Sequence, residues 1–471
     1  MYSIIKTFRI LPFFIFFFNA FIVYSQPYQK TVGEKGNEVI YGSTLVNKGG
    51  VVSAGYTESP GYNADGKDVL MFKVNSSGGL DWNFIYKGEG DQEVKNVIET
   101  TDEGFVLVGY TTNAGSGKDI LVMKTDKEGG ILWQKSIGTA GEDEAMDVVE
   151  RVFANDTAYA ITGFVNGTGK DLFILIISKS GNINNFFRYA GTGDDIGTSI
   201  ALIPGGSDFI LGGYTNSTGS GNYDVFMINT DWDGSGFGGN FYNSGFDDFA
   251  HDISVDQLGL TNYYSVVGST KNTSGNLDMF YFAHRGDGEL YWNRRYHSTE
   301  DEELYRIKSL GGMGLVACGY TTISGNTDKE AAVMMLDWGG NMEGRRRYSG
   351  CNDEIFYAIS CKVNSDQAFL SGTTSSYGAG SRDALLLGYS TVWGFDSGCQ
   401  NYDLPLSTSS VTWNMVHSTD YLQSVSFNPP INNNYGLVRI LLLQALTIYA
   451  ILPPVSLNLE QEIPPFADPL I

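Results

Sequence analysis

Cysteine is scarce in this chain and is confined to its last third. The 471 residues include four cysteines, Cys318, Cys351, Cys361 and Cys399. Disulfides therefore cannot be the general framework of the fold, although they could brace its end in any of three full pairings. No Cys-x-x-Cys spacing occurs, so we do not expect a zinc site.

Positive charge is also sparse. Lysine and arginine total 30 residues against 53 aspartates and glutamates, which gives a formal net charge of -23. A nucleic-acid partner needs a basic surface and an anionic membrane surface repels an acidic protein, so neither is expected. Cationic partners, divalent ions and neutral ligands are compatible with this charge.

Long apolar runs are few. Ile10 to Tyr24 is almost wholly apolar, follows Lys6 and Arg9, and precedes a cleavage site before Gln26. This pattern predicts a signal peptide over residues 1–25 and a secreted or cell-surface protein, with an uncleaved anchor as the alternative. The run from Ile440 to Leu452 is too short to cross a bilayer, so we expect no membrane span in the mature chain.

A unit of about 50 residues repeats along most of the chain. It contains an apolar run that ends in glycine, often followed by an aromatic residue and threonine, then a loop, an aspartate and a second apolar run. The repeated glycines are Gly55, Gly109, Gly163, Gly213, Gly268, Gly319 and Gly372, and the repeated aspartates are Asp68, Asp119, Asp171, Asp224, Asp278, Asp328 and Asp383. Each unit predicts four short strands and shows no helical periodicity.

Seven four-stranded units predict an all-β, seven-bladed β-propeller over residues 26–390, because radial packing buries both faces of each sheet. A linear β-solenoid is the alternative, but its coils are usually shorter. The last unit lacks a fourth strand, and residues 27–33 match the fourth strand at Trp133 to Gly138. We therefore predict that the N-terminal strand closes the last blade. Residues 391–471 form a C-terminal extension of unassigned structure, for which a strand pair, a packing helix and part of an incomplete domain are all open.

The repeat resembles that of secreted bacterial propellers common in the Bacteroidetes. The resemblance covers Pro27 to Ser390 and rests on the pattern D-x-G-(F/Y)-(V/I)-L-x-G-(Y/F)-T, a loop, and D-(I/V)-(L/F)-(V/M)-x-K. It implies export and a propeller fold, often beside a C-terminal secretion or anchoring domain. It implies no particular activity.

Polar residues of varied type recur on the innermost strand of each unit, where a repeated framework residue would be uniform. They are Tyr41, Asn96, Asp147, Thr198, His251, Arg306 and Tyr357. Such variety predicts a ligand-binding ring at the axis, with a water-filled channel of satisfied polar walls as the alternative. His251, Asp147 and Arg306 are the members capable of acid–base or charge-stabilising roles, but no nucleophile motif accompanies them.

Acidic residues cluster in the connections between units, at Glu142-Asp143-Glu144, Asp194-Asp195, Asp247-Asp248, Glu300 to Glu303 and Asp353-Glu354. Recurrence in almost every unit favours a structural role at turns over a cation-attracting surface. The segment Asp231 to Gly236 resembles a calcium loop but occupies a turn position. We therefore expect no cofactor and leave calcium as the one possibility.

These observations favour an exported, non-catalytic propeller that acts as a monomeric binding or scaffold module for a glycan, a protein or a cell-surface component. The alternative is an extracellular polysaccharide-degrading hydrolase or lyase with its site on the acidic face. A component of an export machine is a third hypothesis.

Overall fold

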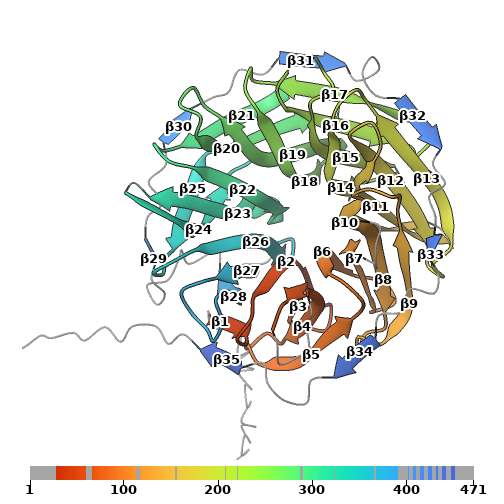
Figure 1. Ribbon diagram of the computed structural model, residues 1–471. Coiled ribbons are helices and arrows are strands. Elements are labelled where there is room, and N and C mark those ends of the chain that lie inside the picture. The colour runs from red at the N-terminus through yellow and green to blue at the C-terminus, as the bar shows by residue number, and fades with distance from the viewer. Residues whose placement is uncertain are drawn as a thin grey trace, which may run out of the picture.

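The chain folds as a ring of seven antiparallel β-sheets arranged around a central axis (Figure 1). The computed structural model describes residues 28–390, except 60–65, 113–116, 154–155, 207, 220, 287–289, 324 and 365–366, and also describes seven short segments between residues 401 and 450. The predicted signal peptide, residues 1–25, lies outside these described residues. The prediction of an all-β, seven-bladed propeller is confirmed.

Four strands in each blade run outward from the axis, in chain order except in blade 7, where β1 takes the fourth position. Blade 1 contains β2 (Glu38–Leu45), β3 (Val51–Thr57), β4 (Asp68–Val74) and β5 (Leu80–Lys87), and blade 2 contains β6 (Gln92–Glu99), β7 (Phe105–Thr111), β8 (Asp119–Thr125) and β9 (Ile131–Ile137). Blade 3 contains β10 (Glu144–Phe153), β11 (Asp156–Asn166), β12 (Lys170–Ser178) and β13 (Ile183–Ala190), and blade 4 contains β14 (Asp195–Leu202), β15 (Phe209–Thr215), β16 (Asp224–Thr230) and β17 (Phe237–Asn243).

The remaining blades follow the same order. Blade 5 contains β18 (Asp248–Leu258), β19 (Thr261–Lys271), β20 (Leu277–Arg285) and β21 (Leu290–His297). Blade 6 contains β22 (Glu302–Ser309), β23 (Leu315–Ile323), β24 (Asn326–Leu336) and β25 (Met342–Tyr348), with a 3-10 turn, η2 (Gly311–Met313), before β23. Blade 7 contains β26 (Glu354–Cys361), β27 (Gln367–Thr374), β28 (Asp383–Ser390) and β1 (Tyr28–Gly33).

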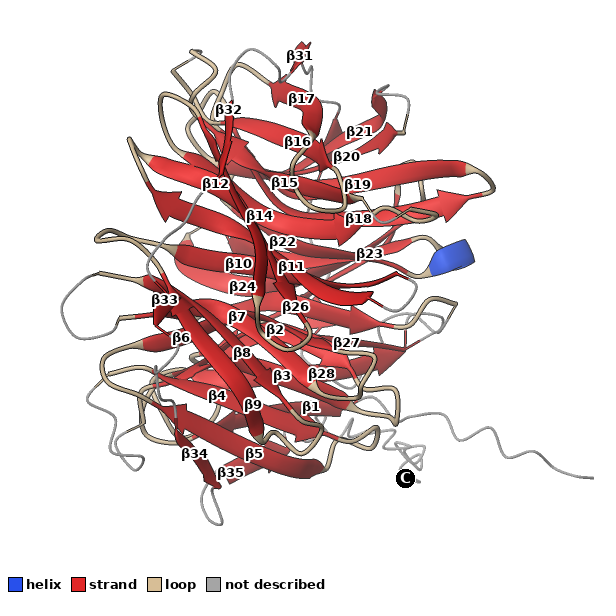
Figure 2. Ribbon diagram, turned by 90° about the vertical axis from the view of Figure 1, so that its right-hand side faces the viewer, coloured by secondary structure: helices blue, strands red, loops and turns tan. Residues whose placement is uncertain are grey.

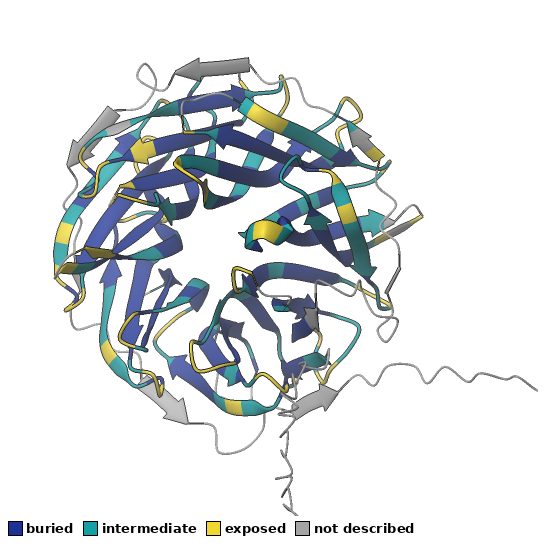
Figure 3. Ribbon diagram, turned by 180° about the vertical axis from the view of Figure 1, so that it is seen from behind, coloured by how far each residue is buried: buried dark blue, intermediate teal, exposed yellow. Residues whose placement is uncertain are grey.

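The hydrophobic core lies between neighbouring blades. Strand β7, with the sequence FVLVGYT, is buried along its whole length because blades pack against both of its faces. In one cluster, Val52 and Met71 of blade 1 pack with Phe105 and Leu107 of blade 2. Exposed residues concentrate at the turns and on the outer strands (Figure 3).

The ring is closed by joining the two ends of the propeller in one sheet. Strand β1 pairs antiparallel with β28, from Tyr28 opposite Gly388 to Val32 opposite Ala384. The predicted closure of the last blade by residues 27–33 is thus confirmed for β1. Opening this joint requires several neighbouring backbone hydrogen bonds to break together.

The C-terminal segment adds a fifth strand to the outer edge of every blade (Figures 1 and 2). We call these seven strands the C-terminal belt: β29 (Asn401–Tyr402), β30 (Ser407–Ser409), β31 (Asn414–His417), β32 (Gln423–Ser426), β33 (Ile431–Asn432), β34 (Val438–Leu441) and β35 (Thr447–Ala450). They pair in turn with blades 6, 5, 4, 3, 2, 1 and 7, so the belt travels around the ring against the order of the blades. This arrangement is none of the three structures considered for residues 391–471.

The repeated glycine faces a β-bulge in the first strand of its own blade. In blade 2 the register shifts between Val94 and Asn96, opposite Gly109, and all seven blades show the same irregularity. A Cβ on Gly109 would lie 1.9 Å from the carbonyl oxygen of Glu93, and the other six glycines have a first-strand carbonyl at 1.8–2.0 Å. Glycine recurs because no side chain fits opposite the bulge.

In blade 6 the third strand begins earlier than the sequence pattern predicts. Asp328 was expected to open this strand, but β24 starts at Asn326, and Thr321 pairs with Glu330 where blade 2 pairs Thr111 with Asp119. Glu330 therefore occupies the position of the repeated aspartate in blade 6, two residues after Asp328. The difference arises because β24 is longer than the third strands of other blades.

Cys318, Cys351 and Cys361 form no disulfide with one another, and Cys399 lies outside the described residues. Cys318 is fully buried in β23 as a small apolar side chain. In the part of the chain that the structure describes, no helix has the length and apolarity needed to span a bilayer.

Candidate functional site

An acidic or amide side chain starts the first strand of every blade, or in blade 3 directly precedes it, and is almost completely buried. These residues are Glu38, Gln92, Asp143, Asp195, Asp248, Glu302 and Glu354, each 0–1% exposed. Asp143 accepts hydrogen bonds from the backbone N–H of Asn166 at 2.7 Å and from the Thr139 hydroxyl at 2.8 Å. The recurring acids therefore hold the connection between blades, which supports their structural interpretation.

The residue directly before the buried acid or amide also forms a hydrogen bond that recurs between blades. Asp91 and Asp353 each accept a hydrogen bond at 2.9 Å from the backbone N–H of a lysine, Lys67 directly before β4 and Lys329 within β24 respectively. These bonds tie the connection between blades to the neighbouring loop. Most acidic side chains in the connections between blades therefore form hydrogen bonds that stabilise the fold.

Buried acids make stability dependent on pH. Burial raises the pKa of Asp195 to about 6 and the pKa values of Asp248 and Glu302 to about 7. In an unfolded chain these groups titrate near pH 4, so between about pH 4 and pH 7 the folded protein holds more protons than the unfolded chain. Its free energy of unfolding must then fall as the pH rises.

We expect that free energy to decrease by on the order of 2 kcal/mol between about pH 5 and pH 8. Denaturant unfolding across this range measures it. The Asp248→Asn variant should show a flatter pH dependence than the parent chain. A free energy of unfolding that increases over the same range would contradict the assignment.

The bulge places one side chain from every blade at the axis. Each bulged residue lies three positions after the buried residue that starts the strand. We call this set the bulge ring: Tyr41, Lys95, Met146, Thr198, His251, Tyr305 and Tyr357. Because a bulge turns an extra side chain out of the sheet, it can present a residue that the blade core does not need.

The bulge ring lines a cavity of 250 Å³, together with Tyr214 and Arg306. We call it the upper cavity, because it lies toward the acidic connections that precede the first strands. Four rings form an arc along its wall, with centroids 5.0 Å apart between Tyr41 and Tyr357, 5.1 Å between Tyr357 and Tyr305, and 5.2 Å between Tyr305 and His251. The Nζ of Lys95 lies 4.4 Å from the Tyr41 ring centroid.

The tyrosine hydroxyls of this arc are available to a ligand. Among the described residues, none donates or accepts a hydrogen bond at the hydroxyls of Tyr41, Tyr305 or Tyr357. Burial raises the pKa of Tyr357 to about 12 and that of Tyr305 well above its ordinary value. Both phenols therefore stay protonated and can donate.

Carboxylates lie behind the upper cavity and are paired. Lys95 contacts Glu93 at 2.5 Å and Glu144 at 3.2 Å. Although burial opposes it, the Lys95 charge and hydrogen bonds from lysines lower the pKa of Glu93.

A histidine–carboxylate pair also borders this cavity. The Nε2 of His251 lies 3.1 Å from Glu303, and the Tyr320 hydroxyl donates to the same carboxylate at 2.7 Å. Burial opposes ionisation of Glu303, but the hydrogen bond and charge of His251 bring its pKa to about 2. Glu303 is therefore ionised and fixes the orientation of the imidazole.

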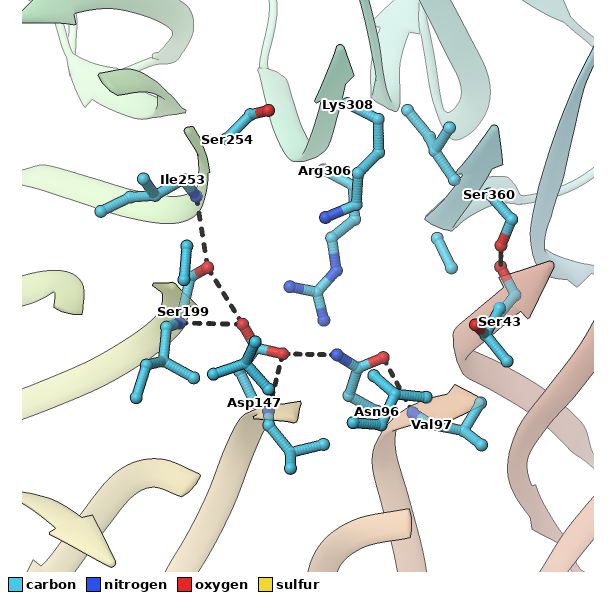
Figure 4. Close-up of a pocket in the computed structure, with 18 of the residues that line it drawn as sticks. Ser43, Asn96, Val97, Asp147, Ser199, Ile253, Ser254, Arg306, Lys308 and Ser360 are labelled. Carbon is cyan, nitrogen blue, oxygen red and sulfur yellow. Dashed lines mark hydrogen bonds between the residues drawn. The ribbon is translucent and has the colours of Figure 1, made fainter. Parts of the chain in front are cut away.

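A second cavity of 480 Å³ lies on the other side of the bulge ring, between the later halves of the first strands (Figure 4). We call it the lower cavity. Asn96 donates to Asp147, whose carboxylate also accepts from the backbone N–H groups of Val148 at 2.8 Å and Ile200 at 2.9 Å. Asp147 thereby joins blades 2, 3 and 4, so its carboxylate is saturated by structural bonds.

The seven residues predicted for an axial ring all lie on first strands, but at two levels. Tyr41, Thr198, His251 and Tyr357 line the upper cavity, Asn96 and Asp147 line the lower cavity, and Arg306 lines both. In blades 2, 3 and 6 the upper positions are occupied by Lys95, Met146 and Tyr305. The sequence had predicted Asn96, Asp147 and Arg306 at these positions. Ligand binding by these residues stays a prediction.

The misplacement has a clear origin. The alignment counted from an apolar residue, but blades 2, 3 and 6 have Glu93, Glu144 and Glu303 where other blades have the first of two apolar residues. Counting three residues from the buried acid or amide at the strand start would have found Lys95, Met146 and Tyr305.

The segment Asp231 to Gly236 forms the turn between β16 and β17. Gly234 donates its backbone N–H to Asp231 at 2.9 Å, and the Ser235 hydroxyl donates to Asp233 at 2.6 Å. Within the described ranges, no three His, Cys, Asp or Glu side chains are grouped so that they could hold a metal ion. Calcium binding by this protein stays untested.

The fold and site define a seven-bladed β-propeller with an aromatic axial cavity. No protein-family model and no curated protein matches the sequence. Among solved structures, the chain is similar to a protein of unknown function from Dyadobacter fermentans, with 9% identity, a TM-score of 0.41, and coverage of 78% of this chain and 99% of that one. A crystal structure of glucose dehydrogenase aligns with 10% identity, a TM-score of 0.36, and coverage of 77% and 99% respectively.

Proposed function

We propose that this protein is an exported, non-catalytic binding module whose upper cavity binds a glycan at the cell surface or outside the cell. The observation that carries the proposal is the arc of Tyr41, Tyr357 and Tyr305, whose rings line the cavity and whose hydroxyls have no intramolecular partner among the described residues. Aromatic faces with a few convergent polar groups suit a ligand that is apolar on one face and hydroxylated at its edge. A sugar ring has that chemistry.

The surroundings of the cavity support binding more than hydrolysis. A glycosidase of the usual kind needs two carboxyl groups about 5–10 Å apart on either side of the scissile bond. Among the described residues that line the upper cavity there is no aspartate or glutamate. Of the carboxylates behind them, Glu93 and Glu144 are neutralised by lysines and Glu303 is paired with His251. We infer a monomer that presents this cavity, because each blade edge is already covered by the C-terminal belt.

Removing one hydroxyl from the arc tests the proposal. We expect the Tyr305→Phe variant to bind its glycan about 5- to 20-fold more weakly, because one donor to the ligand is lost while the ring remains. Tyr305→Ala should abolish detectable binding. A glycan array identifies the ligand, and titration calorimetry measures the affinities.

Tyr291→Ala is the matched control. Tyr291 is 46% exposed on the outer strand β21, away from the axis, so its removal should leave the affinity unchanged. A purified chain that binds no glycan on the array, or equal losses for Tyr305 and Tyr291 variants, would refute the proposal.

One observation favours an enzyme as the second candidate. The His251–Glu303 pair faces the upper cavity beside Arg306, which combines an oriented base with a cation. This pair suits proton abstraction from an acidic sugar, as in a polysaccharide lyase, better than hydrolysis. Incubation with acidic polysaccharides would reveal unsaturated products by ultraviolet absorbance, and His251→Gln should remove that activity.

A further inference from the structure

Arg306 lies at the partition between the two cavities. It follows the bulged Tyr305 on β22 and contributes to the walls of both the upper and the lower cavity. Its side chain is 13% exposed. In Figure 4 it projects toward the space between the blades, beside Lys308 of the same strand.

The guanidinium of Arg306 has no hydrogen-bond partner among the described residues. Its only ion pair there is with Asp252, with 3.6 Å between the nitrogen and oxygen atoms, which exceeds hydrogen-bond length. Asp252 already accepts from the Ser199 hydroxyl at 2.9 Å and from the backbone N–H of Ile307 at 2.9 Å. The blade framework therefore satisfies this carboxylate without Arg306.

The nitrogens of Arg306 are not among the buried polar atoms without a partner, so its donors are accessible from the cavities that the side chain lines. Five donors in a planar fork suit the paired oxygens of a carboxylate or sulfate. Lys308, 44% exposed and 3.8 Å from Asp252, adds a second positive charge to the lower cavity. The acidic and basic side chains that line the two cavities are Lys95, Arg306, Lys308, His251 and Asp147, and the Asp147 carboxylate is saturated by structural hydrogen bonds.

We propose that the glycan is acidic and that Arg306 binds its carboxylate or sulfate group at the partition, while the sugar rings lie against the tyrosines of the upper cavity. This inference rests on the proposed function and narrows its ligand class. Lys95 is already neutralised by Glu93 and Glu144, so Arg306 is the residue that distinguishes an acidic ligand from a neutral one. Asp252 and Glu303 face the same region, so a single acidic group on the ligand fits better than a dense polyanion.

The test compares three oligosaccharides of equal length, one neutral, one bearing a uronate and one bearing a sulfate, at low and high salt. We expect the acidic ligands to bind about tenfold or more tightly than the neutral one, with a difference that shrinks in salt. Arg306→Gln should erase that preference, so that the acidic and neutral ligands bind this variant with similar affinity. Arg306→Lys should keep part of the preference, and Arg294→Gln on the outer strand β21 should keep all of it.

The two proposals fail separately. If neutral and acidic ligands bind equally well, or if Arg306→Gln keeps the preference, the acidic-ligand inference is overturned and glycan binding stands. If none of the three binds the parent chain, and the array also shows no ligand, the proposed function itself is overturned. A uronate preference without a sulfate preference, or the reverse, identifies which anionic group Arg306 accepts.

Discussion

Replacing Gly109 by alanine is expected to destabilise the protein by about 3 kcal/mol or more, an unusually large effect for a single added methyl group. The new Cβ would lie 1.9 Å from the carbonyl oxygen of Glu93, which belongs to the bulged strand β6. A backbone atom cannot rotate away as a flexible side chain can, so β6 itself must shift. The shift would also displace Lys95, the bulge-ring residue of this blade.

Gly238→Ala is the matched control for this substitution. Gly238 lies in β17, and a Cβ added there would meet no atom within 4 Å. The control should be neutral or slightly stabilising, because alanine restricts the unfolded chain more than glycine does. Denaturant unfolding of both variants gives the comparison, and a loss below about 1 kcal/mol for Gly109→Ala would contradict the steric role of the repeated glycine.

Removing the C-terminal belt is expected to open the outer edge of the ring. A chain that ends at Ser390 leaves seven outer strands, β5, β9, β13, β17, β21, β25 and β1, with unpaired backbone groups. Unpaired edges are templates for pairing with other chains, so this variant should aggregate at concentrations where the full chain stays monomeric. Sedimentation velocity measures that difference.

A shorter truncation isolates the effect on ring closure. Strand β35 pairs with β1 from Lys30 opposite Ala450 to Gly33 opposite Thr447, and β1 is the strand that closes the ring. A chain that ends before Thr447 should lose hydrogen-exchange protection in β1 by about tenfold or more, equivalent to about 1.4 kcal/mol, with little change in β9.

A chain that ends at Leu452 keeps all seven belt strands and should behave like the full chain. Unchanged protection of β1 in the shorter truncation would show that the belt does not support closure. These variants separate two roles of the belt, because only the chain that ends at Ser390 uncovers every edge.

Both of these predictions concern the stability of the propeller, but the same changes should also affect the upper cavity. The bulge ring is held by seven bulges, and each bulge requires its glycine and its buried acid or amide. The tyrosine arc joins blades 1, 7 and 6, so it crosses the sheet that β1 closes. Loss of closure should therefore weaken ligand binding even though no residue of β1 lines either cavity.

The sequence by itself determined the ring and its closure. The glycine at Gly55 and its six counterparts recurs because every blade repeats the same steric conflict, and a repeated local constraint is visible without any structure. The match of residues 27–33 to a fourth strand follows from the same repetition. The structural role of the buried acids could also be predicted from the sequence, because they recur at the connections between units.

Only the tertiary structure decided which residues meet at the axis and where the C-terminal segment goes. Blades 2, 3 and 6 have Glu93, Glu144 and Glu303 where the other blades have an apolar residue, so an alignment anchored on apolar residues placed Asn96, Asp147 and Arg306 where Lys95, Met146 and Tyr305 lie. The belt strands are two to four residues long and pair only with edges that the assembled blades provide. Such contacts are set by partners distant in the chain, and no local pattern encodes them.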